Sequence, residues 1–400
     1  MMLLRIFSMI VLCVIISLAE QGQVLTGIDV LEKELFSPLR GKRIGLITNH
    51  TGQNRNGVST IDILFQAPDV KLIRLFAPEH GLRGIMDEAV TDDVDPKTQL
   101  PVISLYGKNR QPLPEHLADL DMLVFDIQDI GTRFYTYIST MAFCMRSAAE
   151  NNKQIMVLDR PNPINGIMVS GLIPPDSLCG KFTAIYPIPT RHGMTIGELA
   201  EMFNRHFKIG AQLQVIPMQN WQRSMFWEET GLPWINPSPN MKTMTGAICY
   251  PGLGWLETTS LSMARGTEIP FEMYGAPYID EHALFNKLKE YPIPGARIIP
   301  CRFLPTTPHH KFNQEKCRGL RIIITDRNRF EGLPLGLTIA QTLLQLYPND
   351  YKLSNGTAVS LGSAVALEQL RQKVPVEEII RQNQARLDEF IKIRQDYLKY

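Results

Sequence analysis

Four short apolar segments of this 400-residue chain each end in a cluster of polar side chains. Asparagine, histidine and threonine gather at 48–52, and a glutamate is followed by a histidine at 79–80. Two aspartates and a glutamine lie at 126–129, and an aspartate, an arginine and an asparagine lie at 159–162. One such cluster would be an ordinary loop or helix cap. Four of them indicate a polar pocket whose carboxylates could donate and accept protons.

The sequence patterns of common cofactor sites and nucleophiles are missing. No G-x-G-x-x-G follows the first apolar segment, and there is no Walker A loop, H-E-x-x-H or G-x-S-x-G. His309-His310 is an adjacent pair, whereas zinc sites usually need three or four spaced ligands. We therefore predict no cofactor and no metal, which leaves carboxylate chemistry on a polar ligand.

The segments that carry the clusters are predicted to be strands of a parallel sheet. Between Lys42 and about Pro217, runs rich in Val, Ile and Leu alternate with helix-length segments. Such runs, buried on both faces and joined by helices, are typical of a doubly wound α/β sheet. The predicted strands are Arg43–Thr48, Lys71–Phe76, Val102–Leu105, Met122–Ile127, Gln154–Leu158 and Leu213–Ile216. Because ligands of such sheets bind beyond the carboxyl ends of the strands, the four clusters should meet at one edge.

Helices are predicted between these strands. The segments Thr60–Phe65 and Tyr137–Asn151 are amphipathic. Thr195-x-x-Glu198 has the pattern of a capping box, in which the threonine hydroxyl and the glutamate side chain bind each other's backbone N–H groups. It should open a helix that runs to about His206.

The pattern changes after about Thr243. We predict turn-rich loops first, then strands at Arg297–Phe303 and Leu320–Thr325. The predicted helices that follow are Leu337–Leu346, Ala364–Lys373 and Val376–Tyr397. We therefore expect a doubly wound α/β domain over residues 20–245 and a smaller α+β domain over residues 246–400.

The first residues have the three parts of a secretory signal. Arg5 supplies a positive charge, Ile6–Ile16 is almost entirely apolar, and Ser17-Leu18-Ala19 offers small residues where signal peptidase requires them. The alternative is a membrane anchor, but the apolar stretch is shorter than the roughly 20 residues of a spanning helix. We predict a signal peptide over residues 1–19, an exported, periplasmic or secreted protein, and no transmembrane segment in the mature chain.

The charge of the mature chain argues against nucleic acid as a partner. The chain has 41 basic and 40 acidic residues, and cleavage after Ala19 removes Arg5 alone, so the mature chain is formally neutral. A basic surface supplies most of the affinity for nucleic acids. For the cysteines, which form no CxxC pair, we favour buried free thiols over a single bridge between Cys301 and Cys317.

Seven motifs of the chain closely resemble those of the NamZ family, the exo-β-N-acetylmuramidases. They are GLITNHTG (45–52), FAPEHG (76–81), DIQDIGTRFYTY (126–137), LDRPNP (158–163), HGMT (192–195), PSPN (237–240) and RGT (265–267). The resemblance implies a Rossmann-like domain, a smaller C-terminal domain and an active site in the cleft between them. It also implies release of terminal N-acetylmuramic acid from the non-reducing end of peptidoglycan glycans, with glycan fragments as the partner.

Glu79 is the expected general acid. Protonating a leaving glycosidic oxygen requires a carboxyl group whose pKa is raised by partial burial, and Glu79 follows the apolar residues Phe76 and Ala77. The resemblance places the family's catalytic glutamate in this Pro-Glu-His-Gly run. The alternative for Glu79 is a carboxylate that stabilises a helix N-terminus.

The second catalytic group stays open. A glycosidase often uses two carboxylates, whose separation decides between inversion and retention, and Asp126, Asp129 and Glu257 are candidates. The 2-acetamido group of the sugar can instead attack the anomeric carbon, in which case a carboxylate and a tyrosine orient it. Asp126 or Asp129 with Tyr135 or Tyr137 would fit that route.

Further residues are expected to bind the sugar. A guanidinium binds a carboxylate through paired hydrogen bonds, so an arginine should bind the lactyl group. The candidates are Arg133, Arg160, Arg191 and Arg265. The remaining polar contacts are expected from Asn49, His80, Gln128, Asp159, Asn162, His192 and Asn240. For His192 the alternative is a buried histidine that binds the backbone.

Two other functions compete with the muramidase. One is a periplasmic sugar-binding protein without turnover, which several carboxylates around an anionic sugar disfavour. The other is an exported hydrolase of an amide or ester in the wall peptide, which the lack of a zinc set or an activated serine or cysteine disfavours.

Overall fold

The computed structural model describes residues 22–79, 81–82, 93–107, 109–308, 310–354 and 356–400. The predicted signal peptide, His80 and His309 lie outside these residues. Within the described ranges, no helix is both long and apolar enough to cross a membrane.

The larger half of the described chain is built on a seven-stranded sheet with the order β3-β4-β2-β1-β5-β6-β7. The strands β4, β2, β1, β5, β6 and β7 are parallel neighbours, and β3 runs antiparallel to β4. Their bounds are β1 Arg43–Thr48, β2 Lys71–Ala77, β3 Asp93–Val94, β4 Pro101–Ser104, β5 Met122–Asp126, β6 Gln154–Leu158 and β7 Gln212–Ile216. Each predicted strand agrees with an observed one to within a residue or two, and the predicted α/β class is confirmed.

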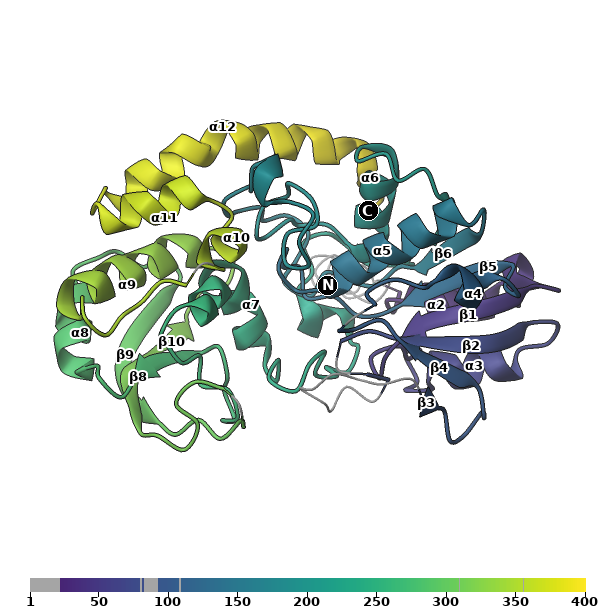
Figure 1. Cartoon of the computed structure of the whole chain (residues 1–400), viewed down its shortest axis with the longest axis horizontal. Coiled ribbons are helices and arrows are strands. Elements are labelled where there is room, and N and C mark those ends of the chain that lie inside the picture. The colour runs from purple at the N-terminus through teal and green to yellow at the C-terminus, as the bar shows by residue number, and fades with distance from the viewer. Residues whose placement is uncertain (1–21, 80, 83–92, 108, 309, 355) are drawn as a thin grey trace, which may run out of the picture.

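Helices cover both faces of this sheet (Figure 1). The helices α5 (Tyr137–Glu150) and α6 (Ile196–Arg205) pack on one face, and α2 (Gly27–Lys33) and α3 (Thr60–Gln66) pack on the other. Along β1, Ile47 belongs to the first core while Leu46 belongs to the second. This alternation explains why the strands are apolar throughout, since both of their faces are buried.

The strand order fixes where a ligand can bind. Without the short edge strand β3, the parallel strands have the order of a Rossmann fold. From β1 the chain adds β2 and β4 on one side, and it then crosses back to add β5, β6 and β7 on the other side, so the strand order reverses between β1 and β5. Thr48 and Asp126, the last residues of these two strands, lie opposite each other. The four polar clusters follow β1, β2, β5 and β6, which are neighbours in the sheet, so the predicted common edge is confirmed.

The capping box predicted at Thr195 is confirmed. The backbone N–H of Glu198 donates to the Thr195 hydroxyl at 3.2 Å, and the Thr195 N–H donates to the Glu198 carboxylate at 3.0 Å. Replacing Thr195 by alanine is expected to cost about 2 kcal/mol of unfolding free energy, because both the cap and the hydrogen bond from the hydroxyl to the buried Asp159 carboxylate are lost. Urea denaturation measures this cost, and Thr195→Ser, which keeps the hydroxyl, should stay near the wild type. Equal losses in both variants would contradict the capping role.

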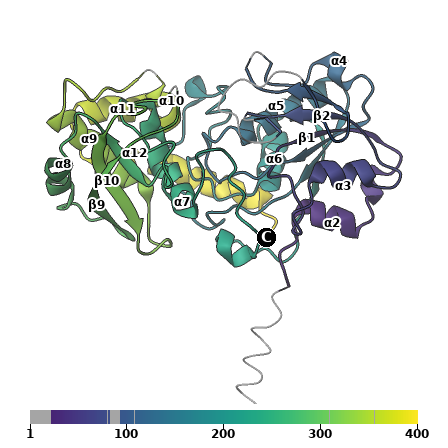
Figure 2. The same cartoon turned by 90° about the horizontal axis from the view of Figure 1, so that it is seen from below.

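A three-stranded antiparallel sheet with the order β8-β10-β9 forms the centre of the second half (Figure 2). The bounds are β8 Met273–Ala276, β9 Ala296–Phe303 and β10 Cys317–Ile324. The helices of the described chain not yet given are α4 Pro114–Leu117, α7 Met244–Leu253, α8 Glu281–Leu288, α9 Gly332–Leu346, α10 Thr357–Leu361, α11 Ala364–Arg371 and α12 Val376–Arg394. The predicted smaller α+β half is thereby present.

The prediction of turn-rich loops after Thr243 is wrong. The helix α7 begins at Met244, and both β8 and α8 follow before the first predicted strand of this half. The helix α7 contains Gly246, Pro251 and Gly252, and most of its side chains are buried. A helix that is apolar all round has no amphipathic period, so the sequence pattern gave no helical signal.

The last residues of the chain return to the first sheet. In Figures 1 and 2, α12 passes from the side of α11 to the side of α6. At its end the Arg394 guanidinium donates to the carbonyl of Gly193 at 3.0 Å. The hydroxyl of Tyr400 donates to the Asp159 carboxylate at 2.6 Å. The C-terminal helix therefore holds the two halves together.

The cysteines of the described chain are free thiols. Cys317 lies opposite Phe303 in the second sheet, whereas Cys301 lies opposite Gly319, so the two are not paired across the strands. The bridge considered between Cys301 and Cys317 is therefore absent.

Candidate functional site

A pocket of about 290 Å³ lies beyond the carboxyl ends of β2 and β5 and is lined by residues from both halves of the chain. Its lining residues are Glu79, Tyr106, Phe134, Tyr135, Thr136, Tyr137, Thr183, Ser238, Met241, Tyr250, Glu257, Arg265, Phe271 and His310. Five residues of the predicted site therefore meet here: Glu79, Tyr135, Tyr137, Glu257 and Arg265. The volume is close to the lower end of typical ligand pockets and suits one sugar ring.

Glu79 is held at the pocket wall by the start of α5. It follows Pro78 directly after β2, and its Oε2 accepts a hydrogen bond of 2.5 Å from the hydroxyl of Thr136. Thr136 is the residue that precedes the first turn of α5. The strand end and the helix start thus fix this carboxyl group between them, with its side chain only partly buried.

Three tyrosines form the wall beside Glu79. The Tyr135 ring meets Tyr137 and Tyr250 edge to face, with ring centroids 5.1 and 6.2 Å apart. The Tyr137 hydroxyl donates to the carbonyl of Pro237 at 2.6 Å and accepts from the Asn49 amide at 3.0 Å. Burial and then the nearby Glu79 raise the pKa of Tyr137 far above its ordinary value, so its hydroxyl stays protonated. The wall offers neutral hydroxyl groups and apolar ring faces.

The other carboxylate among the described lining residues, Glu257, pairs with Arg265. The Arg265 Nε–H donates to its Oε1. Burial alone would raise the pKa of Glu257, but Arg265, followed by Lys311 and His310, holds that pKa below its ordinary value. Glu257 is therefore ionised at neutral pH and does not donate a proton.

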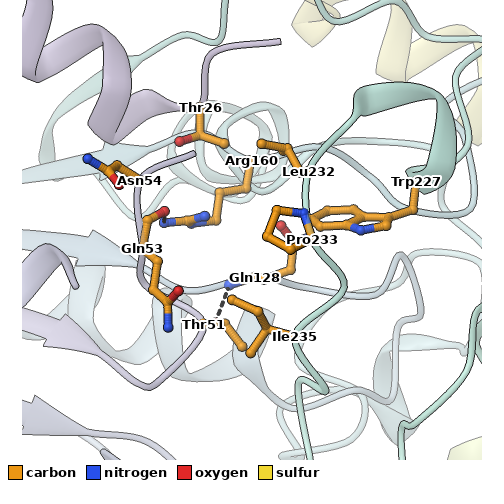
Figure 3. Close-up of a pocket in the computed structure, with 10 residues that line it drawn as sticks. All are labelled: Thr26, Thr51, Gln53, Asn54, Gln128, Arg160, Trp227, Leu232, Pro233 and Ile235. Atoms are coloured by element: carbon orange, nitrogen blue, oxygen red, sulfur yellow. Dashed lines mark hydrogen bonds between the residues drawn. The ribbon is translucent and has the colours of Figure 1, made fainter. Parts of the chain in front are cut away.

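Two predicted residues, Gln128 and Arg160, instead line a small pocket of about 20 Å³ above the point where the strand order reverses (Figure 3). Apolar side chains that include Trp227, Pro233 and Ile235 line the same pocket. Its space is sufficient for about one water molecule and far too small for a sugar. The segment around 227–235 thus occupies the crevice in which other sheets of this type bind ligands.

Asp126 forms a buried ion pair with Arg160 and itself lines neither of these two pockets. The Arg160 guanidinium donates to both carboxylate oxygens of Asp126, at 2.5 and 2.8 Å, and the Thr60 hydroxyl donates to Asp126 at 2.5 Å. Asp126 is fully buried. These contacts leave Asp126 no route to a substrate in the larger pocket.

Most other predicted contacts are structural in this fold. Arg133 is fully buried and donates to the carbonyls of Thr183, Val359 and Ser360, and Arg191 donates to the carbonyl of Ile164. The carboxylate of Asp159 accepts from Thr195, Gly197 and Tyr400. The amides of Asn49, Asn162 and Asn240 bind neighbouring loops, and His192 is fully buried with Nδ1 accepting from Met194. These residues shape the loops at the sheet edge and do not line the pocket.

Asp129 lies behind the tyrosine wall beside His192. Its Oδ2 accepts from the Gly131 N–H at 2.7 Å and lies 3.8 Å from the His192 Nε2, while its buried Oδ1 has no hydrogen-bond partner among the residues that the structure describes. Burial raises the pKa of Asp129 to about 7 and lowers the pKa of His192 to about 3. The His192 imidazole is therefore neutral. Asp129 and His192 together lie next to the pocket.

The raised pKa of Asp129 predicts a pH dependence of stability. The folded chain keeps a proton on Asp129 that the unfolded chain releases above about pH 4, so this contribution is full below pH 4 and is lost as the pH rises to about 7. Asp129→Asn should remove it. The difference in melting temperature, wild type minus variant, is expected to fall between pH 4 and 7 in calorimetric scans. A difference that rises with pH would contradict the assignment.

Several lining residues carry no role in the sequence-based prediction. Thr136 and Ser238 lie inside the motifs at 126–137 and 237–240, where their polar hydroxyl groups were the signal in the sequence that could have placed them in the site. Tyr250 lies on the unrecognised helix α7, and Tyr106 follows β4. His310 enters the sequence-based prediction only as half of the adjacent pair His309-His310. Within the described ranges, no three His, Cys, Asp or Glu side chains come close enough to hold a metal ion.

Comparison with known proteins gives consistent matches over most of the chain. The family model described as "Exo-beta-N-acetylmuramidase NamZ, N-terminal" matches residues 44–245, and its C-terminal counterpart matches residues 248–400. The "Peptidoglycan beta-N-acetylmuramidase NamZ" of Bacillus subtilis (strain 168) is 44% identical over 389 residues, which cover 96% of this chain and 92% of that protein.

Two solved structures of DUF1343 family proteins from Bacteroides fragilis NCTC 9343 share the fold. The first is 37% identical, with a TM-score of 0.87 over 94% of this chain and 99% of its own. The second is 28% identical, with a TM-score of 0.76 over 95% of this chain and 99% of its own.

Proposed function

The chain belongs to the NamZ family of exo-β-N-acetylmuramidases, and from that premise we propose how it acts on peptidoglycan. It is an exo-acting glycoside hydrolase that releases terminal β-linked N-acetylmuramic acid from the non-reducing end of peptidoglycan fragments during cell-wall turnover. The observation that carries this function in the structure is the position of Glu79. Its carboxyl group lies at the wall of a sugar-sized pocket, beside three tyrosines and opposite residues of the second half.

Glu79 is the general acid of the proposed mechanism. Two carboxyl groups are found among the described lining residues, and Arg265 holds Glu257 in its ionised form. The proton for the leaving glycosidic oxygen therefore comes from Glu79, with Thr136 fixing its orientation. The tyrosine wall binds the face of the sugar and its acetamido group. Asp129 acts through this wall as a positioning residue, since it influences the hydroxyl groups of Tyr135 and Tyr137, which line the pocket, but does not line the pocket itself.

The site of action is proposed to lie outside the cytoplasm. The apolar segment Ile6–Ile16, the preceding Arg5 and the small residues before Glu20 support a cleaved secretory signal. A peptidoglycan substrate is found in the same compartment. Expression of the full chain, followed by N-terminal sequencing of the exported protein, tests this; a chain that begins at residue 20 is the expected result.

A pair of chromogenic substrates tests the activity itself. The purified mature protein should release 4-nitrophenol from a β-N-acetylmuramide and not from the matching β-N-acetylglucosaminide, without added metal. Release from neither sugar by folded protein would contradict the muramidase, and binding of wall fragments without turnover would then favour the sugar-binding alternative. Equal release from both sugars would show a general hexosaminidase.

A further inference from the structure

The pocket lies between the two halves of the chain, so its width depends on how the halves are joined. Glu79, Phe134 and Tyr135 line it from the first half, while Glu257 lines it from the second. A sugar that contacts both sides binds well at one separation of these sides, because hydrogen bonds weaken steeply as their distance and angle change. Contacts that fix this separation therefore act on the reaction without touching the sugar.

Arg133 bonds to both halves next to the pocket. Its side chain is fully buried. Its Nη1 donates to the carbonyl of Thr183 at 3.0 Å and to that of Val359 at 3.1 Å, and its Nη2 donates to the carbonyl of Ser360 at 2.7 Å. Thr183 is a lining residue in the first half, whereas the other two acceptors belong to α10 in the second half. A single guanidinium thus ties the two halves together.

In the second half, this guanidinium caps the C-terminus of α10. The helix ends at Leu361, so both acceptors lie in its last turn, where carbonyl groups lack N–H partners within the helix and attract a cation. Burial lowers the pKa of Arg133 to about 10, so the guanidinium is still charged at neutral pH. Gly362 follows with a φ of 95°, and a Cβ atom there would lie 3.1 Å from the Arg133 Nη2. The glycine therefore leaves room for the capping cation.

The helix α10 connects this cap to the second side of the pocket. Its first residue, Thr357, is buried. The hydroxyl of Thr258 donates to the Thr357 hydroxyl at 3.0 Å, and the Thr357 hydroxyl donates to the Thr258 carbonyl at 3.3 Å. Thr258 directly follows Glu257 in the chain. One short helix thus leads from Arg133 to the carboxylate that lines the pocket.

In the first half, Arg133 supports the other side of the pocket. It directly precedes Phe134 and Tyr135, and its backbone N–H donates to the carbonyl of Thr190 at 2.9 Å. Its guanidinium carbon lies 5.9 Å from the centroid of the Phe134 ring, within the range of a cation–π contact. The same ring meets Tyr250 of α7 edge to face, with centroids 5.2 Å apart. Arg133 therefore contacts lining residues directly on one side and through α10 on the other.

We propose that Arg133 is a positioning residue that sets the width of the pocket by holding Glu257 at a fixed separation from Phe134 and Tyr135. The proposal rests on the proposed function, since it concerns the pocket in which the terminal sugar is held. A guanidinium suits this role because its donors point in several directions from a rigid plane, so it can bond carbonyl groups on two sides at once.

The test uses Arg133→Met on 4-nitrophenyl β-N-acetylmuramide and on a disaccharide of N-acetylmuramic acid and N-acetylglucosamine. Its kcat/KM should fall by roughly 10- to 100-fold on both substrates, because a misplacement of about 1 Å caused far from the reacting atoms costs up to 10²-fold. The loss should appear mainly as a higher KM, and the Kd of free N-acetylmuramic acid in calorimetry should rise in parallel. A purely structural role would reduce the folded fraction and so kcat, but would leave KM unchanged.

Arg394→Met is the matched control. Arg394 is also buried, and it also joins the halves by donating to backbone carbonyls, those of Gly193 at 3.0 Å and Ile167 at 3.3 Å. It lies at the end of α12 and does not line the pocket, so its KM should equal that of the wild type even where its melting temperature falls. An equal rise of KM in this variant would overturn the proposal.

Thr357→Val breaks the connection at its next link and decides the question where Arg133→Met does not fold. It removes the hydroxyl that bonds to Thr258 and should raise KM by a smaller factor. Combined with a folded Arg133→Met it should add little, because substitutions along one connected path are not additive. A wild-type KM in folded Arg133→Met or in Thr357→Val would overturn the proposal while the muramidase function stands. No turnover of either substrate by the wild type would instead contradict the function.

Discussion

Glu79→Gln is expected to reduce kcat on a disaccharide of N-acetylmuramic acid and N-acetylglucosamine by roughly 10²- to 10⁴-fold, the range of general acid catalysis. Glutamine has nearly the same shape and can still accept the hydrogen bond from Thr136, so the pocket should remain intact. It has no acidic proton to give to the leaving sugar oxygen. Binding of free N-acetylmuramic acid, followed by calorimetry, should change by no more than a few-fold.

The leaving group distinguishes an acid from a structural residue. A 4-nitrophenolate needs little protonation, so Glu79→Gln should lose much less activity on the 4-nitrophenyl muramide than on the disaccharide. Glu268→Gln is the control, because the Glu268 side chain is 96% exposed and does not line the pocket. Equal losses on both substrates would assign Glu79 a different role, and wild-type activity on the disaccharide would remove it from the mechanism.

Asp126→Asn is expected to destabilise the fold by about 3–5 kcal/mol, the cost of breaking a buried ion pair by removing one partner. The isosteric change leaves Arg160 charged, with 4% of its surface exposed, and takes one acceptor from Thr60. The measurement is urea denaturation of both proteins at pH 7. A double variant, Asp126→Leu with Arg160→Met, removes both charges and should recover much of the loss.

Asp121→Asn is the matched control on the opposite edge of the same sheet. It breaks the ion pair between Asp121 and Arg43, whose side chains are 40% and 48% exposed, respectively. Water and salt screen such a pair, so the variant should lose only a small part of what Asp126→Asn loses. A loss for Asp126→Asn as small as that of the control would show that the buried pair contributes little to stability.

The sequence by itself determined the first sheet. The strands are fixed by apolar runs such as Met122–Asp126, and helix α6 by its capping box, because these signals depend on residues near one another in the chain. The common edge of the polar clusters followed from the rule that parallel strands end on the same side. Glu79 and the Tyr135–Tyr137 segment could be predicted for the pocket because they follow strands directly, and the resemblance to the NamZ family gave their chemistry.

Only the tertiary structure decided which polar side chains face the pocket. Asp126 and Asp129 are three residues apart and equally polar, yet one pairs with Arg160 and the other lies behind the tyrosine wall. Their partners come from positions such as Arg160 and His192, far along the chain. The buried helix α7, which brings Tyr250 to the site, has no amphipathic period and was missed for that reason. Charge pairing and burial depend on contacts between distant segments, and these are set by packing and not by local sequence.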